Sequence, residues 1–289
     1  MTAFDYHEAF NRTVGWVTPA ELDRLKSSRV AIAGLGGVGG SHLLTLSRLG
    51  IGGFNVADFD TFCLANMNRQ AGAFVSTLDQ PKAAVLQRMA NDINPEADIR
   101  VFPAGVNESN YADFLDGVDV YVDGLDLFAV EARRRVFAEC ARRGIPAVTA
   151  APLGMSAALL CFTPGSMGFE DYFQLEGKDE FEQVIRFLLG VAPAMLHRGY
   201  LVHPAAVDLI AHRGPSTPMA CELAAAMAGT ATLKLILKRG KVVVAPSGIQ
   251  FDTFRNKLVR TWRPGGNRNP IQKIGFAVAR SILAAGQKR

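Results

Sequence analysis

The stretch RVAIAGLGGVGGSHLLTLSRLGIGGFNVAD, residues 29–58, decides the fold. It opens with the apolar run Arg29–Ala33, typical of a short buried strand, and a turn rich in glycine follows. A helical pattern at Ser41–Leu49 comes next, and Ile51–Asp58 then predicts a second strand that ends in an acid. Strand, glycine turn, helix and strand in this order predict a βαβ unit.

The same alternation continues on both sides of this unit. Before it, Thr18–Lys26 predicts a helix with Thr18 as its N-cap and Pro19 as its first residue. After it, we expect helices at Lys82–Asn91 and Val130–Arg143, strands at Ile99–Phe102, Val118–Val122 and Ile145–Ala150, and a further run that extends the sheet at Met155–Phe162. Helices and apolar strands in turn predict an α/β fold with a Rossmann-like, doubly wound, mostly parallel sheet.

The remaining residues predict a C-terminal extension of this sheet. We expect a helix of small residues at Cys221–Lys238, strands at Val242–Ala245 and Lys257–Trp262, and a helix at Ile271–Leu283. The segment Thr163–Pro218 mixes Gly, Pro and aromatic residues without a regular period, as lids and substrate loops often do. No repeat or linker divides the chain, so residues 1–289 are expected to form one domain with a nucleotide-binding core at 28–162.

Composition excludes several classes of protein. With 289 residues, 49% of them hydrophobic, the chain can bury a full core without disulfides or metals. Its 31 basic and 27 acidic side chains leave a net charge of +4, too small for a dedicated nucleic-acid binder. The N-terminus lacks the apolar core of a signal peptide, and Glu222 and Lys234 interrupt the apolar stretch Pro218–Leu237, so we expect a soluble, cytoplasmic protein with no membrane span.

Cysteines and histidines give no sign of a metal site. The four cysteines, Cys63, Cys140, Cys161 and Cys221, form no C-x-x-C pair, and the histidines His42, His197, His203 and His212 lack metal-ligand spacing. We therefore expect no zinc, and the first three cysteines are expected in the core because their surroundings are apolar. The tail from Arg260 is basic and predicts a solvated face, with an RNA contact as the alternative.

The glycine turn predicts a nucleotide site. Backbone N–H groups in such a turn, together with the N-terminus of the following helix, can approach phosphates. The glycines concerned are Gly34, Gly36, Gly37 and Gly39, and a tight structural turn is the alternative interpretation. Asp58 ends the second strand, where such folds place a carboxylate on ribose hydroxyls.

Charge favours ATP over NAD. The pyrophosphate of NAD carries about two negative charges, whereas ATP carries about four and needs cations and a metal when its phosphates react. Downstream of Asp58 the chain supplies such groups: Asp60, Asn66, Arg69, Gln70, Lys82, Asp123 and Asp126. An amide, two cations and a carboxylate at the carboxyl end of a parallel strand are the set that polyphosphate chemistry calls for.

At this point the chain resembles a known family. The double glycine in the turn, the string D-x-D-x(5)-N-x-x-R-Q from Asp58 to Gln70, the lysine a dozen residues later and the aspartate after the fourth strand resemble the ThiF, molybdopterin-synthase adenylyltransferase and ubiquitin-activating-enzyme superfamily. The resemblance covers Phe10–Phe162 and, more weakly, Pro218–Gly240. It implies that Asp58 binds ribose, that Asn66, Arg69 and Lys82 hold the triphosphate with support from Asp60 and Gln70, and that Asp126 coordinates Mg²⁺.

The resemblance also implies roles for two residues outside this string. Phe10-Asn11-Arg12 is similar to a family segment whose arginine reaches the γ-phosphate of a neighbouring subunit, so Arg12 is a candidate arginine finger in a homodimer. Some relatives carry a reactive cysteine near Cys221, where a helix N-terminus would activate a thiolate. Ordinary surface and packing roles are the respective alternatives for Arg12 and Cys221. Equally, Arg69 and Lys82 could be solvated helix residues, and Asp60 a turn residue.

What the resemblance implies for function is an ATP- and Mg²⁺-dependent adenylyltransferase. It would join a substrate carboxylate to AMP with release of pyrophosphate, and the acceptor would be a small protein C-terminus, a peptide or a modified nucleoside. The segment 163–289, with Phe169, Tyr172, Phe173, Phe187 and Tyr200, is expected to shape the acceptor pocket and the dimer. Two alternatives stay open: a tRNA-modifying cyclodehydratase of the same fold, and an oxidoreductase that binds NAD or FAD.

Overall fold

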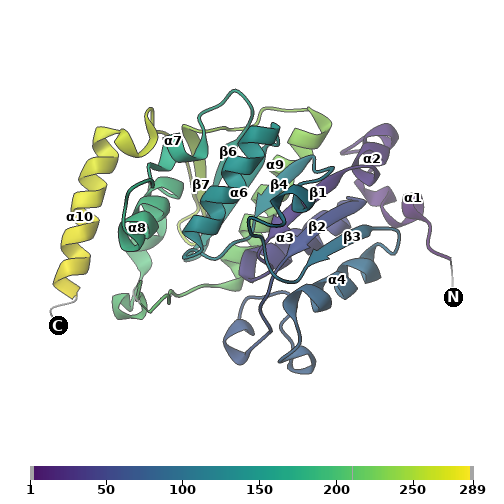
Figure 1. Ribbon diagram of the computed structural model, residues 1–289, viewed down its shortest axis with the longest axis horizontal. Coiled ribbons are helices and arrows are strands. Elements are labelled where there is room, and N and C mark those ends of the chain that lie inside the picture. The colour runs from purple at the N-terminus through teal and green to yellow at the C-terminus, as the bar shows by residue number, and fades with distance from the viewer. Residues whose placement is uncertain (1–2, 210, 287–289) are drawn as a thin grey trace.

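The computed structural model describes residues 3–209 and 211–286. In this part of the chain eight strands form one sheet in the order β3-β2-β1-β4-β5-β6-β7-β8 (Figure 1). The parallel half comprises β1 (Arg29–Ala33), β2 (Gly53–Ala57), β3 (Asp98–Phe102), β4 (Val120–Asp123) and β5 (Ala147–Leu153). The other three strands, β6 (Ser156–Phe162), β7 (Ser247–Asp252) and β8 (Lys257–Trp262), pair antiparallel. The predicted doubly wound, mostly parallel sheet is confirmed.

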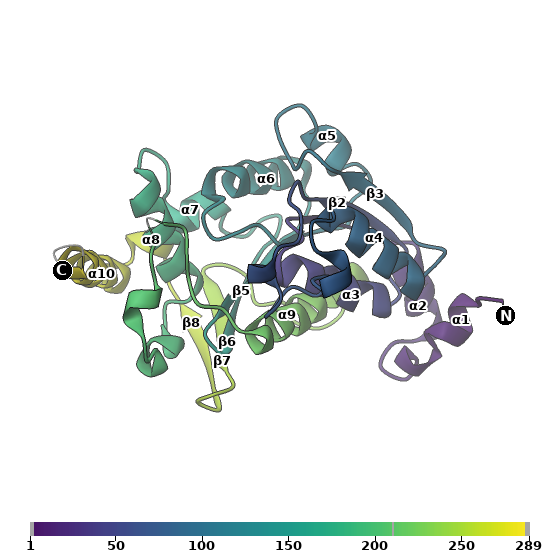
Figure 2. The ribbon, with the colours of Figure 1, turned by 90° about the horizontal axis from the view of Figure 1, so that it is seen from below.

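Helices cover both faces of the sheet. One face packs against α3 (Gly37–Arg48), α4 (Lys82–Ile93) and α9 (Pro218–Leu237), and the other against α6 (Val130–Arg143), α7 (Phe169–Phe173) and α8 (Glu180–Val191). Strand β1 alternates between the two cores, with Ile32 on the first face and Ala31 and Ala33 on the second, as the pleat of a strand requires. Figure 2 shows α3 and α9 side by side.

The ends of the molecule carry the remaining helices. At one end lie α1 (Tyr6–Ala9), the 3₁₀ turn η1 (Asn11–Thr13) and α2 (Pro19–Lys26), and at the opposite end lies α10 (Pro270–Gly286) (Figure 1). Short elements fill the connections: α5 (Tyr111–Phe114), η2 (Leu64–Asn66), η3 (Val75–Thr77), η4 (Leu196–Tyr200), η5 (Pro204–Ala206) and η6 (Gly266–Arg268). The predicted cap of α2 is confirmed, because Thr18 Oγ1 accepts from Glu21 N and Glu21 Oε2 accepts from Thr18 N.

The structure differs from the prediction most clearly at the start of α3 and at Val242–Ala245. Helix α3 begins at Gly37, four residues before the predicted start, although glycine is a poor helix former. The helix tolerates glycine here because its first turn passes close to other backbone: a Cβ on Gly39 would lie 1.8 Å from the carbonyl oxygen of Gly34. The predicted strand Val242–Ala245 is wrong. These residues form no regular strand, and β7 begins only after Pro246, which has no N–H to donate to a ladder.

The segment without a predicted structure contains two helices, α7 and α8. Four of the five aromatic residues singled out above, Phe169, Tyr172, Phe173 and Phe187, are buried in the core between these helices, α6 and β6. These four rings therefore serve the core, since aromatic side chains at helical spacing bury an apolar face, and the role of the segment in shaping an acceptor pocket stays a prediction. Tyr200 is different: its hydroxyl donates to Asp252 and accepts from Met155 N.

Helix α9 is long and apolar enough to cross a membrane by length and composition alone. In this structure it lies on the sheet against α3, β5 and β6, and half of its most apolar window is buried. Its small residues explain the close approach, since Ala224 and Ala228 are fully buried in the core that α3 also enters. Within this fold α9 is thus a core helix.

Candidate nucleotide site

The glycine turn lies at the point where the order of the parallel strands reverses. It follows β1, which has β2 on one side and β4 on the other, and ligands of doubly wound folds bind in the crevice outside the carboxyl ends of such strands. Gly34 has φ of +80°, and a Cβ there would lie 2.4 Å from the carbonyl oxygen of Gly124, just after β4. Only glycine fits this position, so the turn holds the ends of β1 and β4 together.

Beyond the turn, the N-terminus of α3 points its backbone N–H groups toward the crevice. Its N-cap is Gly36, and within the described residues no side chain caps it. A Cβ on Gly36 would meet nothing closer than Gln70 Nε2 at 3.8 Å, so space is open beside the turn. Gln70 is buried, and its Oε1 has no partner among the described residues. A helix of 12 residues with a free N-terminus beside an unsatisfied amide suits a polar, anionic ligand.

Asp58 binds the turn from the end of β2. Its Oδ2 accepts from Leu35 N at 2.6 Å, and its Oδ1 accepts from Asp60 N at 2.8 Å. Burial nevertheless raises the pKa of Asp58, against the lowering effect of these two hydrogen bonds and of Lys82. The carboxylate that was predicted to bind ribose is thus fixed at the edge of the crevice by two backbone donors.

Arg69 and Cys221 both lie against Gly37. A Cβ on Gly37 would be 3.1 Å from Cys221 Sγ and 3.6 Å from Arg69 Nε. The Arg69 guanidinium also donates from Nη1 to Ala65 O and to Asn68 Oδ1, which fixes its orientation beside the helix N-terminus. The structure thus brings one of the two predicted phosphate-binding cations to the glycine turn, together with a cysteine that is 184 positions from Gly37 in the sequence.

Cys221 sits in the first turn of α9 and has no exposed surface. Burial raises the pKa of its thiol, while a hydrogen bond with Ser216 and the charge of Arg69 lower it to a smaller extent. In this conformation the side chain packs under the glycine turn. The nucleophilic role of Cys221 stays a prediction, and it would require the thiol to become accessible.

Lys82 and Asp60 form an ion pair at the site. Lys82 Nζ lies 2.9 Å from Asp60 Oδ2, and Lys82 is buried while Asp60 is exposed. Asn66 is buried nearby and accepts from Cys63 N through Oδ1, so part of its amide already serves the fold of the loop. Asp60 was predicted to support the residues that hold the triphosphate, and its ion pair with Lys82 places it beside one of them. Because Asp60 is exposed, a ligand has room to displace its carboxylate from Lys82.

Asp126 lies beyond β4, on a turn that a buried arginine holds. The Asp126 carboxylate is exposed, and its Oδ1 accepts from Phe128 N. Arg133 donates to the carbonyl oxygens of Leu125 and Asp126, and its Nε lies 2.8 Å from Asp123 Oδ2. Asp123 and Arg133 are each 2% exposed in their side chains, so Asp123 serves the turn and leaves Asp126 as the acid facing solvent.

Sequence reasoning missed Arg133, although a signal for it exists. Arg133 stands in the run Arg133-Arg134-Arg135, and it lies three residues after Val130, four before Phe137 and seven before Cys140, which are buried on α6. A charged residue at an inward position of an amphipathic helix predicts a buried partner.

The structure also bears on the expectations for Arg12 and for the cysteines. The N-terminal segment packs at the far end of α3, where Tyr6 OH donates to Gly50 O about 18 Å along this helix from the glycine turn, and Arg12 of this segment is exposed. A role for Arg12 would therefore have to be exerted on another copy. Cys63 was expected in the core and is exposed, because it precedes η2 on the protruding loop, whereas Cys140 and Cys161 are buried as predicted.

The segment between α8 and α9 crosses the carboxyl ends of the strands. His212 stacks on Phe128 at 4.4 Å, Thr217 Oγ1 donates to Gly154 O, and Asn68 Nδ2 donates to Ser216 O. These contacts place the segment near the turn that carries Asp126 and beside Asn68, the neighbour of Arg69. Among the described residues, no group of three His, Cys, Asp or Glu side chains could hold a metal alone.

Similar proteins share this arrangement of elements. A family model described as ThiF family matches residues 10–273. The chain is 31% identical over 146 residues, 50% of its length, to a tRNA threonylcarbamoyladenosine dehydratase of Haemophilus influenzae, and it covers 55% of that protein. It is 29% identical over 155 residues, 53% of its length, to the molybdopterin-synthase adenylyltransferase of the same organism and covers 63% of it. The chain thus spans less than two thirds of these relatives.

A solved structure extends the likeness to the C-terminal elements. The crystal structure of Escherichia coli MccB with MccA-N7isoASN superposes with a TM-score of 0.68 at 18% identity, over 93% of this chain and 75% of that one. At this identity the match concerns the fold, and it includes the antiparallel half of the sheet.

Proposed function

The chain belongs to the ThiF family, and on that premise we propose that it is an ATP- and Mg²⁺-dependent adenylyltransferase that activates a substrate carboxylate as an acyl-adenylate. The observation that carries the proposal is the convergence of groups at one edge of the sheet. Arg69 lies against the glycine turn after β1, Asp58 and the Lys82–Asp60 pair follow β2, and Asp126 follows β4. These are the charges that a triphosphate and its metal need.

The proposed reaction is a displacement at phosphorus. A carboxylate oxygen of the substrate forms a bond to the α-phosphorus of ATP, the bond to the bridging oxygen breaks, and pyrophosphate leaves with that electron pair. AMP then supplies the leaving group that a free carboxylate lacks. The protein contributes alignment and charge: the N–H groups of the α3 N-terminus and the Arg69 guanidinium face the phosphates, and Lys82 exchanges its contact with Asp60 for a phosphate oxygen.

Asp126 is proposed as the residue that holds Mg²⁺. Bound there with the phosphate oxygens as its other ligands, the ion would neutralise charge on the leaving pyrophosphate, since Mg²⁺ in such sites is commonly held by one or two carboxylates plus phosphates. Arg133 serves this role indirectly, because its hydrogen bonds to Leu125 O and Asp126 O orient the turn.

The proposed acceptor is the carboxylate of a peptide or of a small protein. Relatives support this class: one is named for molybdopterin synthase, and the MccB structure carries MccA-N7isoASN. The segment between α8 and α9 would cover the entering chain, because it lies over the carboxyl ends of β4 and β5 through Phe128 and Gly154.

We also propose that the protein acts as a homodimer. Large apolar side chains are exposed on the loop next to the nucleotide site, namely Phe59, Leu64, Phe74 and Val75, and exposed apolar residues that gather on one segment are typical of interaction sites. A second copy seated there would bring its own N-terminal segment toward the site, which is the route by which Arg12 could reach a phosphate.

Pyrophosphate exchange tests the proposal. With ATP, Mg²⁺ and a panel of peptides and small proteins, at least one carboxylate should support exchange of labelled pyrophosphate into ATP. Asp126→Ala should abolish that exchange while leaving the unfolding curve unchanged, and Asp113→Ala, a matched exposed aspartate on α5, should retain it. Exchange by Asp126→Ala at the parent rate would remove this aspartate from the mechanism, and tight NAD binding that ignores Arg69→Ala would refute the proposal as a whole.

A tRNA-modifying cyclodehydratase is the second candidate. The observation that favours it is the name of the Haemophilus influenzae relative, a tRNA threonylcarbamoyladenosine dehydratase. This candidate predicts that tRNA, and no peptide, stimulates ATP turnover. Filter binding with bulk tRNA at physiological salt separates the two, because the peptide-activating function predicts only weak, salt-sensitive binding.

A further inference from the structure

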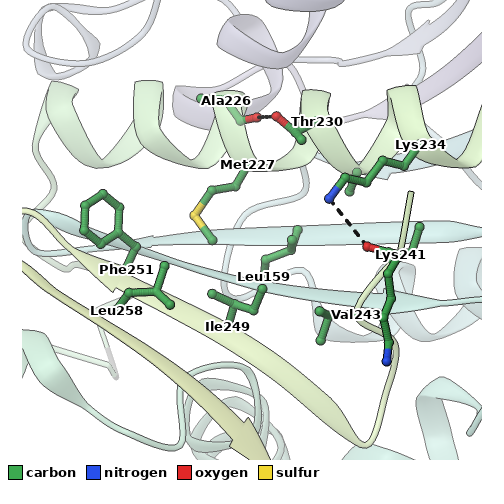
Figure 3. Close-up of a pocket in the computed structure, with 12 residues that line it drawn as sticks. Leu159, Ala226, Met227, Thr230, Lys234, Lys241, Val243, Ile249, Phe251 and Leu258 are labelled. Atoms are coloured by element: carbon green, nitrogen blue, oxygen red, sulfur yellow. Dashed lines mark hydrogen bonds between the residues drawn. The ribbon is translucent and has the colours of Figure 1, made fainter. Parts of the chain in front are cut away.

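A groove separate from the nucleotide site runs along the second half of α9. One wall is α9, through Met227 and Thr230, and the floor is the end of the sheet, through Leu159 of β6 and Ile249 and Phe251 of β7 (Figure 3). The volume is about 320 Å³, within the range of small-molecule pockets. Its lining shares no residue with the glycine turn or with the charged groups around it.

The apolar end of the groove lies against the last two strands of the sheet. Phe251 and Leu258 face each other across β7 and β8, so both side chains project to the same side. Leu258 is 65% exposed, and Met227 lines the groove with it. Exposed apolar side chains in a concave surface indicate a binding site.

Polarity differs between the two ends of the groove. Figure 3 shows Phe251 and Leu258 at one end and Lys234 and Lys241 at the other. Lys234 Nζ donates to the carbonyl oxygen of Lys241 at 3.5 Å, which turns this cation toward the groove. Arg260 lies on the same face, since it is opposite Ile249 in the β7–β8 register. Among the residues that the structure describes, no acidic side chain lines the groove.

We propose that this groove binds an anionic amphiphile: a linear apolar chain lies between α9 and β6–β7, and its anionic head group is held by Lys234 and Lys241. Burial of the ligand's apolar chain against this lining would contribute about 0.8 kcal/mol of binding free energy for each CH₂ group removed from water. The cations supply the complementary charge at one end only, which suits a ligand with one charged end. A second copy of the chain is disfavoured as the occupant, because a twofold contact pairs a patch with the same patch, and this lining has cations but no acidic side chain to pair with them.

Calorimetry with three amphiphiles of one chain length tests the proposal on the full chain. Dodecanoate, 1-dodecanol and dodecyltrimethylammonium, each below its micelle concentration, share the chain and differ in the charge of the head group. Dodecanoate should bind most tightly and the cationic compound most weakly. The double variant Lys234→Gln/Lys241→Gln should weaken dodecanoate about tenfold, since exposed ion pairs contribute up to about fivefold each. It should leave 1-dodecanol unchanged.

Two further variants complete the test. Lys238→Gln removes a cation that is also near the end of α9 but does not line the groove, so it should leave dodecanoate binding unchanged. Thr230→Trp fills the groove from an exposed position and should abolish binding of all three compounds while circular dichroism shows a folded protein. Equal affinity for the three head groups, or unaltered dodecanoate binding by Thr230→Trp, would overturn the proposal. So would a concentration-dependent dimer that Thr230→Trp dissociates, since it would assign this face to a second copy.

Discussion

Replacing Arg133 by methionine tests the buried ion pair behind the candidate metal-binding turn. The change removes the contact between Arg133 Nε and Asp123 Oδ2 at 2.8 Å and the two hydrogen bonds to Leu125 O and Asp126 O. Methionine keeps the apolar stem beside Phe187, over whose ring the guanidinium lies at 4.3 Å. The substitution therefore isolates the loss of charge and donors from the loss of packing.

The expected cost is about 3–5 kcal/mol of unfolding free energy, the range for breaking a buried pair and leaving one charge behind. Asp123 keeps hydrogen bonds from Thr149 Oγ1 at 2.8 Å and Leu125 N at 3.2 Å, which places the estimate toward the lower end. Arg135→Met is the matched control on the same helix. Its pairs with Glu131 and Glu108 are on the surface, so their loss is expected to change the stability little.

Urea unfolding followed by circular dichroism measures both variants. A second substitution, Asp123→Asn in the Arg133→Met background, should recover part of the loss, because asparagine leaves no unpaired charge in the core. The reasoning is refuted if Arg133→Met loses no more than Arg135→Met, or if Asp123→Asn adds a further loss to it. In the first case Asp123 would have to be solvated despite its burial.

Three further predictions concern other positions. Burial lowers the pKa of His42 from 6.5 to about 4. As the pH falls, His42 therefore takes up a proton in the unfolded chain at a higher pH than in the folded one. This difference should remove about 3 kcal/mol of unfolding free energy between pH 6.5 and pH 4. His42→Leu should lack that part of the pH dependence in urea titrations, and an unchanged slope would contradict it. Cys221→Ser should spare pyrophosphate exchange, because the side chain packs under Gly37; if transfer of the acyl group to its final acceptor also survives, no thioester forms at Cys221. Arg12→Ala should cripple exchange in a homodimer. An equal mixture with Asp126→Ala should regain activity, because about half of the dimers are then mixed and each mixed dimer has one complete site. Absence of rescue would rule out action across the dimer.

Several features of this protein could be predicted because they rest on neighbours in sequence. The N-cap Thr18 is present as expected, and the strand Arg29–Ala33 and the helix Val130–Arg143 have the expected bounds. The glycine turn was recognisable for the same reason: few sequences need four glycines in six residues unless backbone must approach backbone or ligand. Spaced charges after β2 and β4 could be read as one set because parallel strands end at the same edge.

Tertiary structure alone decided which side chains meet. The sequence by itself determined the βαβ unit and the charges placed after its strands, since hydrophobic period and turn chemistry are local. It could not indicate that Cys221 would lie under Gly37, that Phe169 and Phe173 would fill the core, or that β7 would start after Pro246 and leave an open face beside α9. Contacts of this kind depend on the order of strands in the sheet and on which faces remain uncovered, and both are settled only when distant segments pack together.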